Sequence, residues 1–238
     1  MKSAIVIGAS SGIGRALAVT LSLEGYRVGV VARRTDLMNS LRAELKGPCV
    51  LKSVDVSQPE LAMLLLRELI DELGDVELFI ISAGTGFDNV APTWEPERET
   101  ITVNVLGFAA MVNVAVAHLE TRRSGHLVGI SSVAAVRGLG RAPAYAASKA
   151  FMSNYLQGIR YRLRKLKLPI VVTDVQHGFV DTRMAKAGRL FWVASPQKAA
   201  TEITGAIRAR KQRVYVTKRW RLIVWMLKIL PDALYLRL

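Results

Sequence analysis

The 238-residue sequence has few cysteines, histidines and acidic residues. Its single cysteine, Cys49, excludes an internal disulfide and a cysteine-rich metal site. The three histidines lack metal-ligand spacing, so we expect no metal. A chain without disulfides is compatible with a reducing compartment, and we expect a cytoplasmic protein. Long apolar runs are also missing, so the sequence predicts neither a signal peptide nor a transmembrane helix.

Acidic residues number 19 against 33 Lys and Arg, which gives a formal net charge of +14. Such a charge attracts anions: nucleic acid, a phosphorylated cofactor or anionic lipid. Much of the excess gathers in residues 160–167 and 208–228. This clustering favours a lipid-facing or subunit-facing surface. Because the sequence has no recognised nucleic-acid module, we expect no nucleic-acid partner.

Short apolar runs typical of buried strands alternate with longer helical patterns. The expected strands are residues 4–8, 27–32, 49–56, 76–84, 126–132, 169–178 and 213–217. The clearest expected helices are residues 14–25, 61–73, 97–119 and 143–167. This alternation predicts a single α/β domain, a doubly wound parallel sheet with helices on both faces. We place that domain at residues 1–217 and a basic, apolar helical tail at residues 218–238.

A glycine-rich turn joins the first expected strand to the first helix. Gly8, Gly12 and Gly14 let the backbone turn tightly and approach a pyrophosphate, while the helix N-terminus supplies amide donors. Its place between strand and helix favours a dinucleotide site over an ordinary tight turn. The intervening residues expected at the same site are Ser10, Ser11 and Ile13.

Two arginines, Arg33 and Arg34, follow the second expected strand. An NAD site usually places an acid there for the ribose hydroxyls, whereas a guanidinium group suits a 2′-phosphate. The sequence therefore predicts NADP(H) in preference to NAD(H); the alternative is a pair of solvated loop arginines. Asp55, at the end of the third strand, is the candidate adenine contact, with Val56 beside it.

A serine, a tyrosine and a lysine form the most informative catalytic pattern: Ser132, Tyr145 and Lys149. Residues four apart share a helix face, so the Lys149 ammonium is expected near the Tyr145 hydroxyl. A nearby positive charge lowers a tyrosine pKa from its usual value of about 10, which would give a tuned proton donor or acceptor. By itself the pair is also compatible with an ordinary surface helix.

Taken together, these motifs resemble the short-chain dehydrogenase/reductase family over about residues 3–184. Ser132 lies thirteen residues before Tyr145, as the family requires, and Asn104 matches the family's active-site asparagine. The glycine turn resembles the family's cofactor loop, with Ile7 where threonine is common. Residues 81–84 resemble an Asn-Asn-Ala-Gly motif without its asparagines.

The resemblance implies a Rossmann-like sheet of seven strands, mainly parallel, in the order 3-2-1-4-5-6-7. It also implies that Ala83 and Gly84 pass close to the cofactor ribose. His177 replaces the proline usually found before the nicotinamide segment, and it either contacts substrate or cofactor or has a plain loop role. The residues expected at the nicotinamide amide are Gly178, Val180 and Thr182.

The resemblance further implies hydride transfer between nicotinamide C4 and a carbonyl or secondary alcohol carbon. Tyr145 would donate the proton and also contact the cofactor, Lys149 would lower the Tyr145 pKa and bind the ribose, and Ser132 would bind the substrate oxygen. Asn104 would hold a water that links Lys149 to solvent. The alternative, a non-catalytic NADP(H)-binding sensor or scaffold, would not need these four residues. Family members commonly form homodimers or homotetramers, often through the helix that carries the tyrosine.

The resemblance implies a substrate pocket built from the loops after strands four, five and six. Their apolar residues favour a lipophilic carbonyl substrate, although such residues could equally pack the lid. The loop after strand four contributes Phe87, Val90 and Trp94, and the loop after strand six contributes Met184, Leu190, Phe191 and Trp192. His118 and His126 lie at the end of a helix and the start of a strand, where a structural role is expected.

The tail has one apolar helical face, expected from Trp220, Val224, Leu227 and Leu230 and widened by Leu222, Met226 and Ile229. Arg221 and Lys228 mark a basic strip with Trp225 between them. The segment is too short to span a bilayer comfortably. Such a helix could lie on an anionic membrane surface, or it could pack on the domain or a partner subunit.

Overall fold

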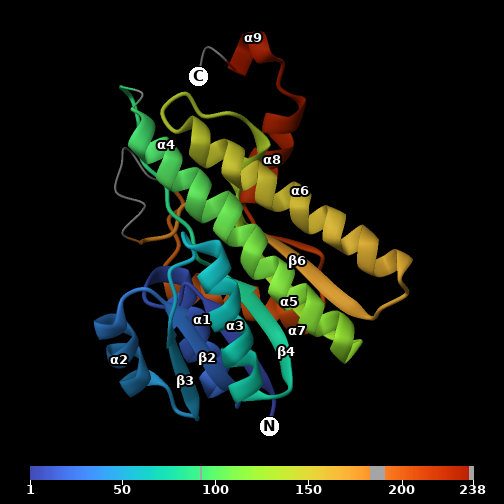
Figure 1. Cartoon of the computed structure of the whole chain (residues 1–238). Helices are drawn as coiled ribbons and strands as arrows, with labels where there is room; N and C mark the ends of the chain where they lie inside the picture. Colours follow the sequence, from blue (N-terminus) through green and yellow to red (C-terminus); the bar gives the residue numbers. More distant parts are fainter. Residues whose placement is uncertain (92, 183–190, 236–238) are drawn as a thin grey trace.

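Parallel strands form one central sheet in a computed structural model, which describes residues 1–91, 93–182 and 191–235 (Figure 1). Over these residues the sheet has seven strands in the order β3-β2-β1-β4-β5-β6-β7, every neighbouring pair parallel. The predicted order is therefore confirmed. The strands are β1 (Ser3–Ile7), β2 (Arg27–Ala32), β3 (Cys49–Ser53), β4 (Val76–Ile81), β5 (Gly125–Ser132), β6 (Ile170–His177) and β7 (Arg213–Val216).

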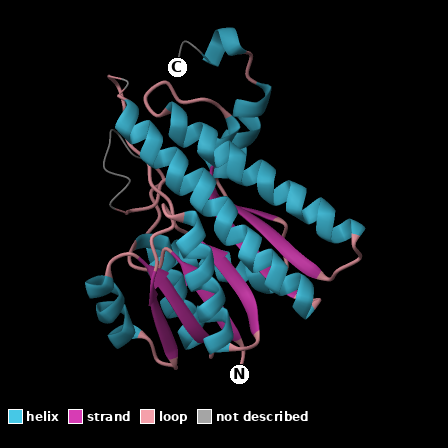
Figure 2. Cartoon of the chain, viewed as in Figure 1, coloured by secondary structure: helices cyan, strands magenta, loops and turns pink. Residues whose placement is uncertain are grey.

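Helices cover both faces of this sheet, as Figure 2 shows. The main ones are α1 (Gly12–Leu23), α2 (Thr35–Glu44), α3 (Pro59–Leu73), α4 (Trp94–Ile101), α5 (Phe108–Arg122), α6 (Pro143–Lys165) and α7 (Pro196–Arg208). Strand β1 shows why its sequence is apolar throughout: Ile5 and Ile7 pack into the core under α3 and α5, and Ala4 and Val6 into the core under α1 and α7. Alternate side chains of a strand point to opposite faces, so both sets must be apolar.

Two helical segments differ from the predictions. The helix expected at residues 97–119 extends over Trp94–Arg122 and contains a π-helical turn, η1 (Thr102–Gly107), which carries Asn104. Helix α7 was not predicted, although Ser195 caps it by accepting a hydrogen bond from the Lys198 amide at 3.2 Å and Pro196 begins it. The strands expected at 49–56, 76–84 and 169–178 end earlier, because their last residues turn into loops.

Only the continuous helical run from Trp94 to Arg122, among the described residues, is long and apolar enough to cross a membrane by length and composition. Inside the protein, however, 61% of its apolar window is buried. The run packs against α3 and α6 as a core helix. Its composition is explained by this burial.

The tail forms two short helices, α8 (Trp220–Ile229) and α9 (Asp232–Tyr235), at the carboxyl end of the sheet (Figure 1). Its apolar residues do not share one face. Trp220 and Val224 are buried against the domain, whereas Leu222 and Ile229 are exposed. The tail therefore packs on the domain and also presents an apolar surface outward; the division at residue 217 stays a prediction.

Candidate active site

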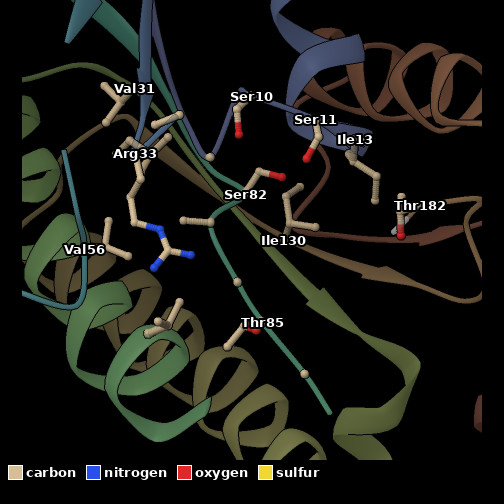
Figure 3. A pocket seen from close by; sticks show the side chains of 18 of the residues that line it. Ser10, Ser11, Ile13, Val31, Arg33, Val56, Ser82, Thr85, Ile130 and Thr182 are labelled. Atoms are coloured by element: carbon tan, nitrogen blue, oxygen red, sulfur yellow. The ribbon is translucent and has the colours of Figure 1, made fainter. Parts of the chain in front are cut away.

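A cavity of about 440 Å³ opens at the carboxyl ends of β1, β2 and β4 (Figure 3). It brings together most of the residues that the sequence assigned to a cofactor. Those lining it are Gly8, Ser10, Ser11, Gly12, Ile13, Arg33, Arg34, Val56, Ala83, Gly84, Lys149, Val180 and Thr182. His177 also lines it. Gly14, Asp55, Tyr145 and Gly178 do not.

The glycine turn leaves no room for side chains. Gly8 has φ +88°, and a Cβ there would lie 2.4 Å from the Ala83 amide nitrogen. A Cβ on Gly14 would lie 2.3 Å from the Gly8 carbonyl oxygen, so Gly14 lets α1 pack against the turn and does not line the cavity. The N-terminus of α1 thus opens directly onto the cavity. This cradle fits the pyrophosphate of a dinucleotide.

The two arginines have different surroundings. The Arg34 guanidinium donates to the Ser10 and Ser11 hydroxyls at 2.9 and 3.0 Å, so it braces the glycine turn. The Arg33 guanidinium is largely exposed, lies 3.8 Å from the Asp55 carboxylate and points into the cavity (Figure 3). Asp55 also accepts hydrogen bonds from the Ser57 amide and hydroxyl. Asp55 therefore holds its own loop and Arg33 instead of lining the cavity.

The serine, tyrosine and lysine meet beside the cavity, and of the three only Lys149 is in its lining. Lys149 is buried; its ammonium donates to the Ile130 carbonyl at 3.1 Å and lies 5.6 Å from the centre of the Tyr145 ring. The Ser132 hydroxyl donates to the His177 carbonyl at 3.2 Å and accepts from the Ala134 amide. The main chain thus fixes the Lys149 ammonium and the Ser132 hydroxyl beside Tyr145.

The electrostatics of this group correct one expectation. Burial raises the pKa of the Tyr145 phenol, and a hydrogen bond with Ser132 opposes that rise. Burial also lowers the pKa of Lys149 to about 8, which Asp174 partly opposes. The pKa of Tyr145 is therefore raised and not lowered as predicted, because desolvation of the phenol is the largest effect on it.

Asn104 joins two walls of the site. Its amide oxygen accepts from the Thr85 amide at 2.8 Å, and its amide nitrogen donates to the Thr85 carbonyl and the Ser148 hydroxyl at 2.7 and 3.0 Å. The loop after β4 is thereby tied to α6, the helix of Tyr145. The expected water between Asn104 and Lys149 stays a prediction.

Sequence reasoning missed two close approaches in and beside the site, of which one is to a catalytic residue. A Cβ on Gly86 would lie 2.5 Å from the Tyr145 ring, so only glycine fits there. A Cβ on Gly178 would lie 1.9 Å from the Trp220 ring. Gly178, expected at the nicotinamide amide, is instead covered by the tail. Neither approach has a signal in the sequence, because each joins segments far apart along the chain.

The histidines fall into two kinds. The Nε2 atoms of His118 and His126 contact the Val76 carbonyl and the Thr173 hydroxyl at 2.9 and 2.7 Å, as structural residues would. Burial, with a smaller contribution from Lys149, lowers the pKa of His177 to about 4, so His177 is neutral near pH 7. Among the described residues, no three His, Cys, Asp or Glu side chains gather as metal ligands would.

An aromatic cluster covers the substrate side. Phe191 stacks on Trp220 with ring centres 5.1 Å apart, and Phe179 and Trp192 pack edge-on against Trp220 at 5.3 and 6.0 Å. Two residues of the expected substrate loop, Met184 and Leu190, lie outside the described residues. The described part of the loop after β6 thus packs on the tail helix.

Comparison with known proteins decides the family. The model of the short chain dehydrogenase family matches residues 2–190, most of the chain. The chain belongs to the short-chain dehydrogenase family. A protein of Myxococcus xanthus named "Uncharacterized oxidoreductase" is 33% identical over 98% of this chain and 94% of its own length.

Solved structures share the fold. An alcohol dehydrogenase from the archaeon Thermococcus sibiricus, complexed with 5-hydroxy-NADP, has a TM-score of 0.80 at 21% identity, over 90% of this chain and 95% of that one. A 3-ketoacyl-ACP reductase from Sinorhizobium meliloti has a TM-score of 0.78 at 25% identity, over 90% and 96%. This short-chain dehydrogenase is therefore an NAD(P)-dependent oxidoreductase.

Proposed function

We propose that the protein is an NADPH-dependent reductase of a lipophilic carbonyl compound, or the corresponding secondary alcohol dehydrogenase. Ser132, Tyr145 and Lys149 gather beside the cofactor cavity, with Lys149 in its lining, and this arrangement carries the proposal. A sensor or scaffold would need the cavity but not this group. The Sinorhizobium relative, named as a 3-ketoacyl-ACP reductase, supports a carbonyl substrate.

The residues have distinct roles in this reaction. A bound nicotinamide cofactor supplies the hydride. Tyr145, whose raised pKa keeps its phenol protonated near pH 7, gives a proton to the carbonyl oxygen. Ser132 turns its hydroxyl from the His177 carbonyl to the same substrate oxygen and stabilises the negative charge that develops there. Lys149 binds the ribose hydroxyls and replenishes the proton on Tyr145.

The preference for NADPH rests on Arg33. Its guanidinium points into the cavity, and its carboxylate partner is 3.8 Å away, so its donors can reach a 2′-phosphate. Of the expected cofactor residues, Ser10, Ser11, Val56, Val180 and Thr182 would complete the site. Asp55 would contribute to binding of the adenosine end of the cofactor indirectly, by holding the Arg33 guanidinium in place.

A panel of carbonyls and alcohols, assayed with NADPH and NADH by absorbance at the nicotinamide band, tests the proposal. We expect turnover of apolar ketones or aldehydes with NADPH and weaker turnover with NADH. Tight NADPH binding without turnover of any carbonyl would favour the sensor or scaffold instead. Equal use of both cofactors would remove the role given to Arg33.

The assembly and the compartment of the enzyme are also inferred. We infer a cytoplasmic homodimer or homotetramer that pairs through α6, whose Tyr161 side chain is exposed. Light scattering after size exclusion measures the mass in solution. Replacing Tyr161 with Glu should lower that mass, and a wild-type monomer at micromolar concentration would contradict the assembly.

A further inference from the structure

Exposed apolar side chains gather at one end of the molecule. Of the twenty large apolar residues exposed in the described part of the chain, twelve come from segments at the carboxyl end of the sheet. These segments are residues 87–90 with Trp94 after β4, Leu139 after β5, residues 191–193 after β6, and residues 222–234 of the tail. The loops after β4, β5 and β6 are also the ones expected to line the substrate pocket. Single exposed apolar residues are ordinary, but a gathered set marks an interaction surface.

The outer face of α8 lies at the centre of this set. Leu222, Trp225, Met226 and Ile229 are between 43% and 68% exposed on the side opposite buried Trp220. At 100° per residue these four span about 100° of the helix circumference. The helix is therefore apolar on two sides, one packed on the domain and one without cover from the described chain.

Cations border this face and acids are absent from the segment. Lys218 and Arg219 precede the helix, and Arg221 and Lys228 lie along one edge of it; all four are exposed. The sequence contains no Asp or Glu from residue 203 to residue 231. An exposed apolar strip beside a cationic edge complements an anionic lipid surface, where the strip enters the acyl region and the cations meet the head groups.

The basic residues of the two expected segments, 160–167 and 208–228, fall at two ends of the molecule, so residues 208–228 do not form one basic surface. Arg160 donates to the Gln212 carbonyl at 2.7 Å and Arg210 to the Pro169 carbonyl at 3.0 Å, at the amino ends of β6 and β7. Lys218 and the cations of α8 follow β7 at its carboxyl end. These tail cations adjoin the apolar face of α8 along the chain.

The tail helix is fixed to both walls of the substrate site. The Arg137 guanidinium, in the loop between Ser132 and Tyr145, donates to the Leu227 carbonyl at 2.8 Å and pairs with Asp232. The Tyr235 hydroxyl donates to the Gly138 carbonyl at 2.7 Å. On the other wall, Trp220 covers Gly178 and stacks on Phe191. The orientation of α8 therefore sets the orientation of the substrate entrance.

We propose that the outer face of α8 docks on an anionic lipid bilayer and holds the substrate entrance against the membrane, so that the carbonyl substrate is a lipid taken from the bilayer. The substrate part of this inference rests on the proposed reductase function. The docking part does not. Vesicle binding therefore tests the docking, and turnover tests the lipid substrate.

Docking is tested by flotation of the full chain, without cofactor or substrate, on vesicles of phosphatidylcholine alone or mixed with phosphatidylglycerol. We expect recovery with the mixed vesicles and little with the neutral ones. Trp225→Glu should lower the partition coefficient about tenfold or more, because it removes an inserted aromatic ring and adds a like charge. Leu166→Glu, the same charge change at an exposed apolar residue beyond the far end of α6, is the matched control and should float like the wild type.

Charge is tested with a second pair of variants. Replacing Lys218, Arg221 and Lys228 with Gln should weaken binding by about 100-fold, since each cation near an anionic surface is worth about fivefold. Replacing Lys165, Arg208 and Lys211 with Gln removes the same charge elsewhere and should weaken it far less. Equal losses of vesicle binding in the two triple variants would contradict docking through the outer face of α8.

A second copy of the chain is the competing occupant. The proposal would be overturned if the wild type bound neither kind of vesicle and instead self-associated in a concentration-dependent way that Trp225→Glu abolished. The outer face of α8 would then bind a second copy of the chain and not a bilayer. Circular dichroism and thermal unfolding of each variant show whether its fold is retained. A variant that unfolds is replaced by Ile229→Ser, which alters the same face without a charge.

The substrate class is tested by turnover with NADPH. Anionic vesicles should raise kcat/KM for a long-chain ketone dissolved in them at least about tenfold in the wild type and not in Trp225→Glu. A short water-soluble ketone, assayed without vesicles, should be reduced equally by both proteins. Turnover of the short ketone with no effect of vesicles on the long one would refute the lipid substrate and leave the reductase intact; no turnover of either would refute the reductase and leave the flotation result standing.

Discussion

Replacing Gly86 with alanine tests the positioning of Tyr145 more sharply than removing the tyrosine hydroxyl does. The new methyl group would lie 2.5 Å from the Tyr145 ring, whereas ordinary contact begins near 3.4 Å. Ring and loop must therefore separate by about 0.9 Å (3.4 minus 2.5). A displacement of about 1 Å at a reacting group costs on the order of 100-fold in rate. We expect kcat to fall by about that factor.

The assay is NADPH oxidation with the best carbonyl of the panel, together with NADPH affinity measured by fluorescence. Gly86 lines the cofactor cavity and Tyr145 does not, so the NADPH affinity shows separately whether the new methyl group also disturbs the cofactor. Gly140→Ala is the matched control, since a Cβ there meets nothing within 4 Å. A Gly86→Ala variant with the kcat of the wild type would refute the close approach of this loop to the tyrosine.

Three further predictions test other parts of the structure. Arg33→Ala should weaken NADPH binding about tenfold and leave NADH binding unchanged, measured by fluorescence titration; an equal change for both would refute a contact with the 2′-phosphate. Trp220→Ala should lower the free energy of unfolding by about 3 kcal/mol in urea, because it empties a site packed by three aromatic rings, and Trp220→Phe should cost less. Burial lowers the pKa of His126 from 6.5 to about 4, so the unfolded chain takes up its proton first. The contribution of His126 to the free energy of unfolding should be fully present above pH 6.5 and should decrease toward pH 4 by up to about 1.4 kcal/mol per pH unit. In urea unfolding, His126→Gln should make the free energy of unfolding fall less steeply over this range.

The sheet and the cofactor turn were predictable because their causes are local in the sequence. Buried parallel strands are apolar on both sides, as Ala4–Ile7 in β1 shows, and this pattern is continuous in the chain. Gly8 and Gly14 follow that strand at fixed spacing, so the turn could be placed before its close contacts with Ala83 were known.

The features that sequence reasoning missed depend on distant segments or on solvation. The π-helical turn around Asn104 interrupts no apolar pattern, so periodicity over residues 97–119 predicted a plain helix. The contact between Gly178 and Trp220 joins residues 42 positions apart. The pKa of Tyr145 depends on burial, which spacing from Lys149 does not reveal.

The tail contains one feature that the sequence predicted and one that it could not predict. Its helix was predictable from composition, but a helical pattern cannot tell which apolar residues pack inward. The structure assigns Trp220 and Val224 to the interior and Trp225 to the exterior. Truncation at residue 217 would therefore remove a core side chain as well as the outer face, and point variants of the outer face are the cleaner test.

Turnover by Tyr145→Phe tests the central claim most directly. The variant keeps the ring that packs against Gly86 and lacks only the hydroxyl that donates the proton. We predict that kcat for carbonyl reduction with NADPH falls at least about 100-fold, while NADPH affinity and thermal unfolding stay within error of the wild type. Turnover by Tyr145→Phe close to that of the wild type would contradict the account.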